Sequence, residues 1–243
     1  MSEKARAKGQ QPGLPLTATD FASLAAARSG MYDFLAGLCT KPTAKEIDAI
    51  LRHPIDLPGD IVPESLRKSL EAFQACFSEV SKEGTEQSLQ VDWTRLFRGV
   101  AKGYSPLPPY ESVYKEGLLQ GPTAKSVARL YATNGVGLPN TSKELPDYIG
   151  VEFKFMSTLA SKEAEAWCAD ASKAEQLIEG QLLFAREHLQ AWVPRFCDEA
   201  QKFARTDFYR AAIQVIRSIS EWDSILLDAL EETVSNASWV KDR

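Results

Sequence analysis

The side chains best suited to nucleophilic, acid–base or metal chemistry are few in this sequence and lie far apart. There are two histidines and four cysteines among 243 residues, and no two cysteines form a Cys-x-x-Cys pair. A zinc site needs several such ligands at close spacing, so the sequence predicts no metal and no cofactor. His188 has no nucleophile beside it and is predicted to be a partly buried structural histidine.

Motifs that bind phosphates or activate a serine are missing as well. The sequence has no phosphate-binding loop, no dinucleotide-binding glycine motif and no Gly-x-Ser-x-Gly elbow. Acidic pairs such as Glu163 with Glu165 and Glu231 with Glu232 have the pattern of a solvated helix face. The four cysteines lie in apolar helical contexts and are predicted to be buried thiols in a reducing compartment. The sequence therefore predicts a protein that is not an enzyme.

The most unusual segment is a run of prolines and aromatic residues from Tyr104 to Tyr114. Its prolines restrict the backbone to extended conformations, and they lose little entropy on ordering. The interleaved tyrosines add large contact areas with a polar tip. Such a surface can line a groove for a peptide. It can equally be a stiff connector between two helical halves, and the residues alone leave both readings open.

Bulk composition narrows the partners. The formal net charge is −5 at pH 7, which disfavours nucleic acid because its phosphates need compensating Lys and Arg. No apolar stretch approaches the roughly 20 residues needed to span a bilayer, and the N-terminus has no apolar signal core. We expect a cytoplasmic protein without stable membrane insertion. Residues 1–16 are polar and aperiodic, which predicts a disordered tail.

Apolar spacing is helical almost throughout, so the predicted fold is all-α. We expect a single domain over residues 17–243 with roughly nine or ten helices of ordinary length. Its N-terminal helices span 17–98, a Pro-rich hinge-like loop spans 99–121, and its C-terminal helices span 122–235. Predicted helix starts are Thr19 or Asp20, the capping-box pairs Thr43 with Glu46 and Ser172 with Glu175, Pro122, and a restart at Pro194.

Three segments carry a family resemblance. Leu96-Phe97, followed by Pro108-Pro109-Tyr110-Glu111-Ser112-Val113-Tyr114, resembles the signature of the TorD/DmsD/NarJ family. These proteins are dedicated maturation chaperones of molybdopterin oxidoreductases. The segments Pro146–Met156 and Glu187–Phe196 are similar to that family's acidic motif and to its Glu-His-Leu…Trp-x-Pro element. The matches occur in order between residues 93 and 196, and the first is closest to the TorD-like and DmsD-like branches.

The resemblance implies an all-helical fold and a binding function. Family members bind the twin-arginine signal peptide and apoprotein of a molybdoenzyme catalytic subunit, and hold it in the cytoplasm until its cofactor is inserted. Tyr148 stands where the family commonly has His, which removes a titratable group. The peptide-contacting positions that carry over are Trp93, Leu96, Phe97, Pro108, Pro109, Tyr110, Glu111, Ser112, Tyr114, Gly121, Asp147, Tyr148 and Glu152.

A twin-arginine signal combines a basic pair with an apolar stretch, and each part needs its own partners. Glu111, Asp147 and Glu152 are the predicted carboxylates for the arginines. The predicted apolar groove consists of Trp93, Leu96, Phe97 and Tyr110, with Arg28 and Tyr32 expected at its border. The alternative for Trp93 and Phe97 is simple core packing. The prediction requires that all these segments meet in space.

Two other functions stay open. A NarJ-like assembly adaptor for an enzyme that is not exported would share the family motifs without reading twin arginines. A nucleotide-dependent switch is the weaker alternative, because no phosphate loop is present. The hinge-like segment 99–121 would permit either a monomer or a domain-swapped homodimer.

Overall fold

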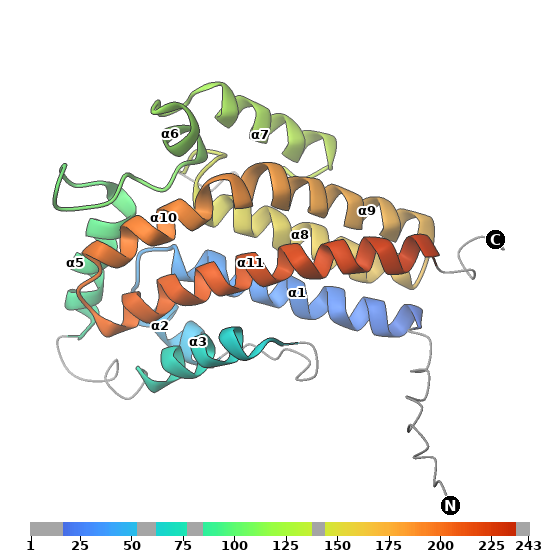
Figure 1. The fold of residues 1–243 in the computed structure, drawn as a ribbon, viewed down its shortest axis with the longest axis horizontal. Coiled ribbons are helices and arrows are strands. Elements are labelled where there is room, and N and C mark those ends of the chain that lie inside the picture. The colour runs from blue at the N-terminus through green and yellow to red at the C-terminus, as the bar shows by residue number, and fades with distance from the viewer. Residues whose placement is uncertain (1–16, 53–61, 77–84, 138–143, 237–243) are drawn as a thin grey trace, which may run out of the picture.

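The computed structural model describes residues 17–52, 62–76, 85–137 and 144–236, and this part of the chain is helical with no β-ladder beyond two isolated bridges (Figure 1). The all-α prediction is confirmed. The predicted tail 1–16 and most of the expected loop 54–62 lie outside the described residues. The elements are α1 Ala18–Leu38, α2 Ala44–Arg52, α3 Glu64–Ala75, α5 Thr85–Arg98, α6 Glu111–Glu116, α7 Pro122–Thr133, α8 Ile149–Trp167, α9 Ala171–Phe184, a π-helical turn Ala185–Leu189, α10 Gln190–Phe203 and α11 Asp207–Asn236.

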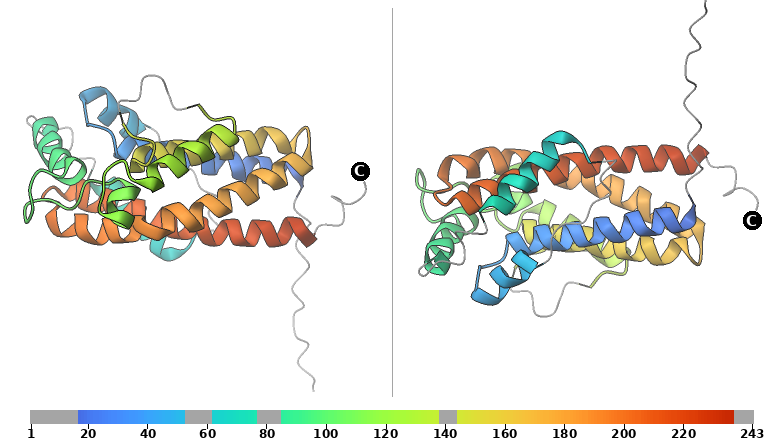
Figure 2. Two further views of the ribbon diagram at one scale, coloured as in Figure 1. Left: turned by 90° about the horizontal axis from the view of Figure 1, so that it is seen from above. Right: turned by 90° about the horizontal axis from the view of Figure 1, so that it is seen from below.

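Long helices form the body of the molecule. Helices α1, α8, α9 and α11 run along its longest axis, and α1 packs most extensively on α8 (Figures 1 and 2). Helix α3 packs on α11, while α6 and α7 cover the opposite side. Helix α5 lies at one end. A single cluster of buried apolar side chains extends from α1 to α11, so the described helices share one hydrophobic core. No helix in the described ranges is long and apolar enough to cross a membrane.

The centre of the bundle holds a buried ionic network that the sequence did not reveal. Arg28 Nε lies 2.6 Å from Asp223 Oδ1, and Arg28 Nη1 lies 2.9 Å from Glu163 Oε2. Gln181 Oε1 accepts from Arg28 Nη2 at 2.9 Å, and the Tyr32 hydroxyl donates to Asp223 Oδ2 at 2.7 Å. All five side chains are buried. The solvated face predicted for Glu163 is therefore wrong, and so is the predicted place of Arg28 and Tyr32 beside a groove.

Local sequence patterns predicted the first residue of some helices correctly and of others incorrectly. Thr43 Oγ1 accepts from Glu46 N at 3.4 Å, as its capping-box spacing predicts, and Pro122 opens α7. Helix α1 instead has Thr17 as its N-cap, in a capping box with Asp20. Helix α9 begins earlier than the pair Ser172 with Glu175 indicated, because its N-cap is Asp170, which accepts from Lys173 N.

The Asp170 cap gives a stability prediction. We expect Asp170→Ala to lower the free energy of unfolding by about 1 kcal/mol, because Lys173 N loses its side-chain acceptor at 3.2 Å. Ser172→Ala is the matched control, since Ser172 is exposed inside the helix and its replacement should change little. Urea unfolding measures both. A larger loss in Ser172→Ala would contradict this assignment of the cap.

Two further expectations need correction. Pro194 does not restart the chain but lies inside α10. The π-helical turn directly before α10 offers the reason, because a widened turn accommodates local mismatch in a helix. Cys39 and Cys197 are buried as predicted, whereas Cys76 is half-buried and Cys168 is exposed. The latter two stand at the C-caps of α3 and α8, where these helices end near the surface.

Candidate functional site

The proline-rich loop and the start of α8 are joined by backbone hydrogen bonds. Tyr110 and Tyr148 form an antiparallel bridge, and their rings lie 5.3 Å apart between centroids. Glu111 N donates to Asp147 O at 2.9 Å. The proline-rich loop and the segment around Asp147, which were expected to meet in space, therefore do so.

The end of α5, which carries Trp93, Leu96 and Phe97, reaches the same place through one carbonyl group. Trp93 Nε1 donates to Cys39 O at 3.0 Å, and the Tyr148 hydroxyl donates to the same oxygen at 2.6 Å. Both side chains are buried. The residue that follows α1 thus holds α5 against the start of α8, so the end of α5, the proline-rich loop and the start of α8 converge.

The apolar residues predicted to line a groove are instead packed in the core. Leu96 and Phe97 are fully buried, and Trp93 is 5% exposed. The Phe97 ring lies 5.7 Å from Phe196 and 6.0 Å from Tyr209 between centroids. The core-packing alternative describes their placement correctly. Any role in peptide binding stays a prediction and would require them to become accessible.

The segment 99–121 is less irregular than its prolines indicated, because α6 lies inside it. Gly99 has φ +62°, and a Cβ built there would lie 2.8 Å from the ring of Pro108. Only glycine suits this position, which folds the loop back against α5. Tyr110 and Pro108 are half-buried, whereas the other predicted loop residues, Pro109, Ser112, Tyr114 and Gly121, are buried.

The three predicted acidic residues lie in the interior rather than on an open surface. Glu111, Asp147 and Glu152 are all 0% exposed. Asp147 Oδ2 accepts from Ser112 N at 3.0 Å, which supports the first turn of α6. Glu152 Oε2 accepts from Trp192 Nε1 at 3.2 Å. These carboxylates therefore join helices, which explains their burial and corrects the prediction that they line a groove.

These buried acids influence one another. Glu111 lies 2.8 Å from His188 Nδ1 and 3.0 Å from Lys115 Nζ. Burial opposes the charge on Glu111, but His188 and Lys115 outweigh it and lower the pKa of Glu111. Burial, together with the nearby Glu111, raises the pKa of Glu152 well above its ordinary range. Of the two carboxylates, Glu152 therefore binds a proton more readily than Glu111.

His188 is a structural residue, as predicted, and more deeply buried than expected. The residue is 6% exposed, and its ring stacks on Phe184 with centroids 4.7 Å apart. Its partner Glu111 comes from a distant part of the chain. The sequence could not supply that pairing.

One partly exposed carboxylate of this region is Glu144, which the sequence reasoning missed. Tyr110 donates its hydroxyl to Glu144 Oε2 at 2.8 Å, and Arg98 Nη2 donates to Glu144 Oε1 at 2.7 Å. In the sequence, Glu144 could have been found as a candidate because it lies three residues before Asp147, which belongs to a segment with the family resemblance. Glu144 borders a cavity of about 480 Å³ whose lining combines acids, one lysine and apolar side chains: Asp33, Ala36, Gly37, Thr40, Tyr131, Val136, Gly137, Glu144, Tyr148, Gly150, Val151, Lys154, Phe155 and Thr158.

A second hollow lies on the outer face of α5. Tyr104 is 68% exposed at its edge, so the first tyrosine of the loop is the one that meets solvent. The volume is about 790 Å³, and the lining residues are Lys41, Gln87, Gln90, Val91, Thr94, Arg95, Val100, Ala101, Tyr104 and Arg205. The two hollows differ in charge, because this one is lined by Lys41, Arg95 and Arg205 and by no acidic residue, whereas Asp33 and Glu144 border the other.

Comparison with known proteins places this architecture in a family. A relative from Vibrio vulnificus (strain CMCP6), the chaperone protein TorD, is 29% identical over 203 residues, covering 81% of this chain and 93% of the relative. The chaperone protein TorD of Photobacterium profundum is 28% identical over 170 residues, covering 69% and 76%. A solved structure from Archaeoglobus fulgidus, described as a candidate redox enzyme maturation protein, is 17% identical with a TM-score of 0.48 and covers 80% of this chain and 92% of its own.

The family model for the nitrate reductase delta subunit matches residues 60–198, more than half of the chain and all three motif segments. The relatives are named as chaperones, which agrees with the prediction that the chain is not an enzyme. The chain therefore belongs to the nitrate reductase delta subunit family, and the resemblance to TorD/DmsD/NarJ proteins is confirmed.

Proposed function

We propose that this protein is a cytoplasmic maturation chaperone of a molybdopterin oxidoreductase. It binds the twin-arginine signal peptide and the apoprotein of the catalytic subunit, assists cofactor insertion and withholds export until folding is complete. Membership of the family and the TorD chaperones among its relatives support this role. The proposed chaperone consists of a single domain over residues 17–243 and exists as a monomer or as a domain-swapped homodimer.

The observation that carries the proposal is the cavity beside Glu144. Two acids, Asp33 and Glu144, border it together with apolar side chains such as Val151 and Phe155. A basic pair followed by an apolar stretch needs both kinds of partner, since guanidinium groups favour carboxylates and the apolar part favours contact with apolar side chains. Tyr110 and Tyr148 connect this cavity to the proline-rich loop.

In this proposal the buried motif residues act behind the binding surface. Trp93 and Tyr148 hold the end of α5 against α8, and Asp147 fixes the start of α6. Tyr148 and Asp147 position Glu144 and the loop rather than forming the outermost contacts, while one ring face of Trp93 lies under Arg98. This accounts for motif residues that lie in the interior.

Isothermal titration calorimetry with the twin-arginine signal peptide of the molybdoenzyme encoded nearest this gene tests the proposal. We expect a micromolar Kd, and Glu144→Gln should weaken binding about tenfold, the scale of one charge-assisted hydrogen bond. Glu165→Gln is the matched control, because Glu165 is exposed elsewhere on α8. Absence of binding to peptide and apoprotein, together with normal cofactor loading in a deletion strain, would sink the proposal.

The family description favours one alternative, an assembly adaptor for an enzyme that is not exported. The two roles separate on one change in the peptide. Replacing Arg-Arg by Lys-Lys should weaken binding to a signal-peptide chaperone, because lysine lacks the planar fork of donors. An adaptor should bind its client equally well with either pair.

A further inference from the structure

The chain's own Arg98 occupies a position suited to a partner's arginine. Its guanidinium carbon lies 4.7 Å from the centroid of the Trp93 ring. Its Nη2 donates to Glu144 Oε1 at 2.7 Å, while Tyr110 donates to the other oxygen of the same carboxylate. An aromatic face and a carboxylate are the two groups that recognise a guanidinium most effectively.

The surroundings of this contact are those of a surface site. The Arg98 side chain is 41% exposed and that of Glu144 is 23% exposed, whereas the ion pair of Arg28 with Glu163 is buried at 0% and 1%. A half-exposed pair contributes little to stability because water and salt screen it. Arg98 can therefore leave Glu144 at small cost, which a structural ion pair cannot do.

We propose that Glu144, Tyr110 and the face of Trp93 form an arginine subsite that Arg98 fills when no partner is bound. An incoming arginine of the signal peptide displaces Arg98 from Glu144 and takes over the hydrogen bond to Oε1. The exchange replaces one guanidinium–carboxylate pair by another. The peptide's arginine therefore competes with Arg98 for the subsite. This inference rests on the proposed function, since it names the regulation of that same site.

Competition sets a threshold for binding. A peptide with one cation of the wrong shape gains too little to displace Arg98, because it forfeits the stacking that Arg98 makes on Trp93. A peptide that brings a guanidinium and an adjoining apolar stretch gains both the exchange and the contacts in the cavity beside Glu144. The internal arginine thus favours the twin-arginine signal over other basic segments.

Removing the competitor should strengthen binding. We expect Arg98→Gln to bind the twin-arginine peptide about threefold to tenfold more tightly than the natural chain, the fold-change for losing a weak ion pair with a cation–π contact. Calorimetry measures the Kd, and circular dichroism checks the fold. Adding Glu144→Gln to this variant should abolish the gain, because the subsite then lacks its carboxylate.

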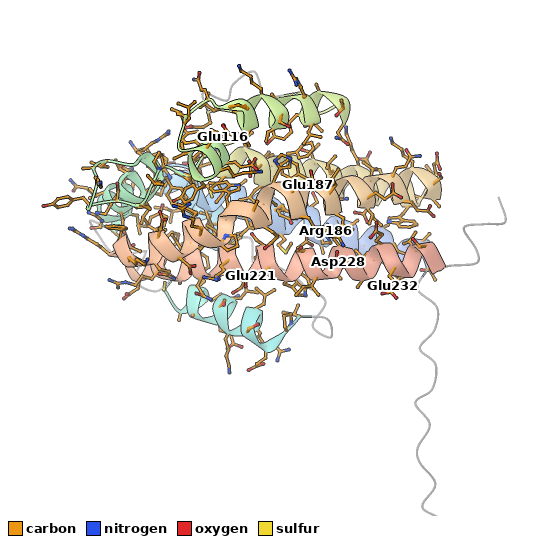
Figure 3. The ribbon with its side chains drawn as sticks, turned by 45° about the horizontal axis from the view of Figure 1, so that its top comes forward. Glu116, Arg186, Glu187, Glu221, Asp228 and Glu232 are labelled. Carbon is orange, nitrogen blue, oxygen red and sulfur yellow. The ribbon has the colours of Figure 1, made fainter. Side chains whose placement is uncertain are left out.

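Arg186→Gln is the matched control. Arg186 also forms a half-exposed ion pair, with Asp228, and Figure 3 shows the two side by side away from α5. Its replacement removes the same charge from the chain and should leave the Kd unchanged. A similar gain in this variant would mean that net charge alone improves binding, which would overturn the competition.

The outcomes separate the two proposals. Equal or weaker binding by Arg98→Gln, with the natural chain binding normally, overturns the arginine subsite and leaves the proposed function standing. No binding by either protein overturns both. Arginine amide adds a probe that needs no signal peptide: in saturation-transfer NMR it should contact Arg98→Ala more strongly than the natural chain, and equal signals would again overturn the subsite.

Discussion

Replacing Arg28 by Met is expected to lower the free energy of unfolding by about 3–5 kcal/mol, the cost of leaving buried charges unpaired. Arg28 is the cation that both Asp223 and Glu163 contact, at 2.6 and 2.9 Å, and all three side chains are at most 1% exposed. The loss would be a large part of the roughly 5–15 kcal/mol that stabilises an ordinary domain. Urea unfolding followed by circular dichroism measures it.

Two further variants test whether this loss of stability is specific to the buried network. Arg67→Met removes an arginine whose pair with Glu64 is 52% and 63% exposed, and it should cost less than about 1 kcal/mol. Arg28→Lys keeps the charge but loses the fork that contacts three side chains, so it should fall between them and stays measurable if the Met variant does not fold. Equal stability of Arg28→Met and Arg67→Met would contradict the network's role.

Local patterns predicted much of the helix layout. Thr43 with Glu46 and Pro122 marked true helix starts, because capping depends on residues three or four apart in the sequence. Periodic apolar positions likewise indicated an all-helical chain. The convergence of the loop with the start of α8 was expected from the resemblance, and the Tyr110 to Tyr148 bridge places these segments together.

The polar interior was beyond local patterns. Arg28 and Asp223 are 195 residues apart, and Arg28 and Glu163 are 135 apart, so no window of sequence contains both partners. An acid at a helical position is usually exposed, and this expectation placed Glu163 on a solvated face although it is buried. The ion pair between Arg98 and Glu144 was also missed because its partners are far apart in the sequence, although both residues adjoin segments that carry the family resemblance.

Glu152→Gln is expected to stabilise the fold by about 1–3 kcal/mol at pH 8, the range for relieving the desolvation cost of a buried polar group. Glu152 Oε2 accepts from Trp192, and burial together with the nearby Glu111 disfavours the charged form of Glu152. A glutamine keeps an acceptor for Trp192 and can donate an N–H group toward Glu111. It reproduces the protonated acid and cannot ionise.

The gain should depend on pH with a definite sign. Burial and the nearby Glu111 raise the pKa of Glu152 in the folded state, so the folded chain binds its proton more tightly than the unfolded chain. The resulting stabilisation is complete below the unfolded pKa of about 4.3 and is lost as pH rises toward the folded value. The advantage of Glu152→Gln should therefore grow as pH rises above about 4.3 and level off once pH passes the folded-state pKa of Glu152.

Glu111 should behave in the opposite way, because His188 and Lys115 outweigh burial and lower its pKa. Its contribution is present above the unfolded pKa and is lost as pH falls, so Glu111→Gln should cost most at neutral pH and least in acid. Glu165→Gln, at an exposed position, is the control for removing one carboxylate from the chain. Urea unfolding of the three variants between pH 4 and pH 8 measures how the free energy of unfolding of each depends on pH. If the stability advantage of Glu152→Gln shrinks as pH rises, the raised pKa belongs to a carboxylate other than Glu152.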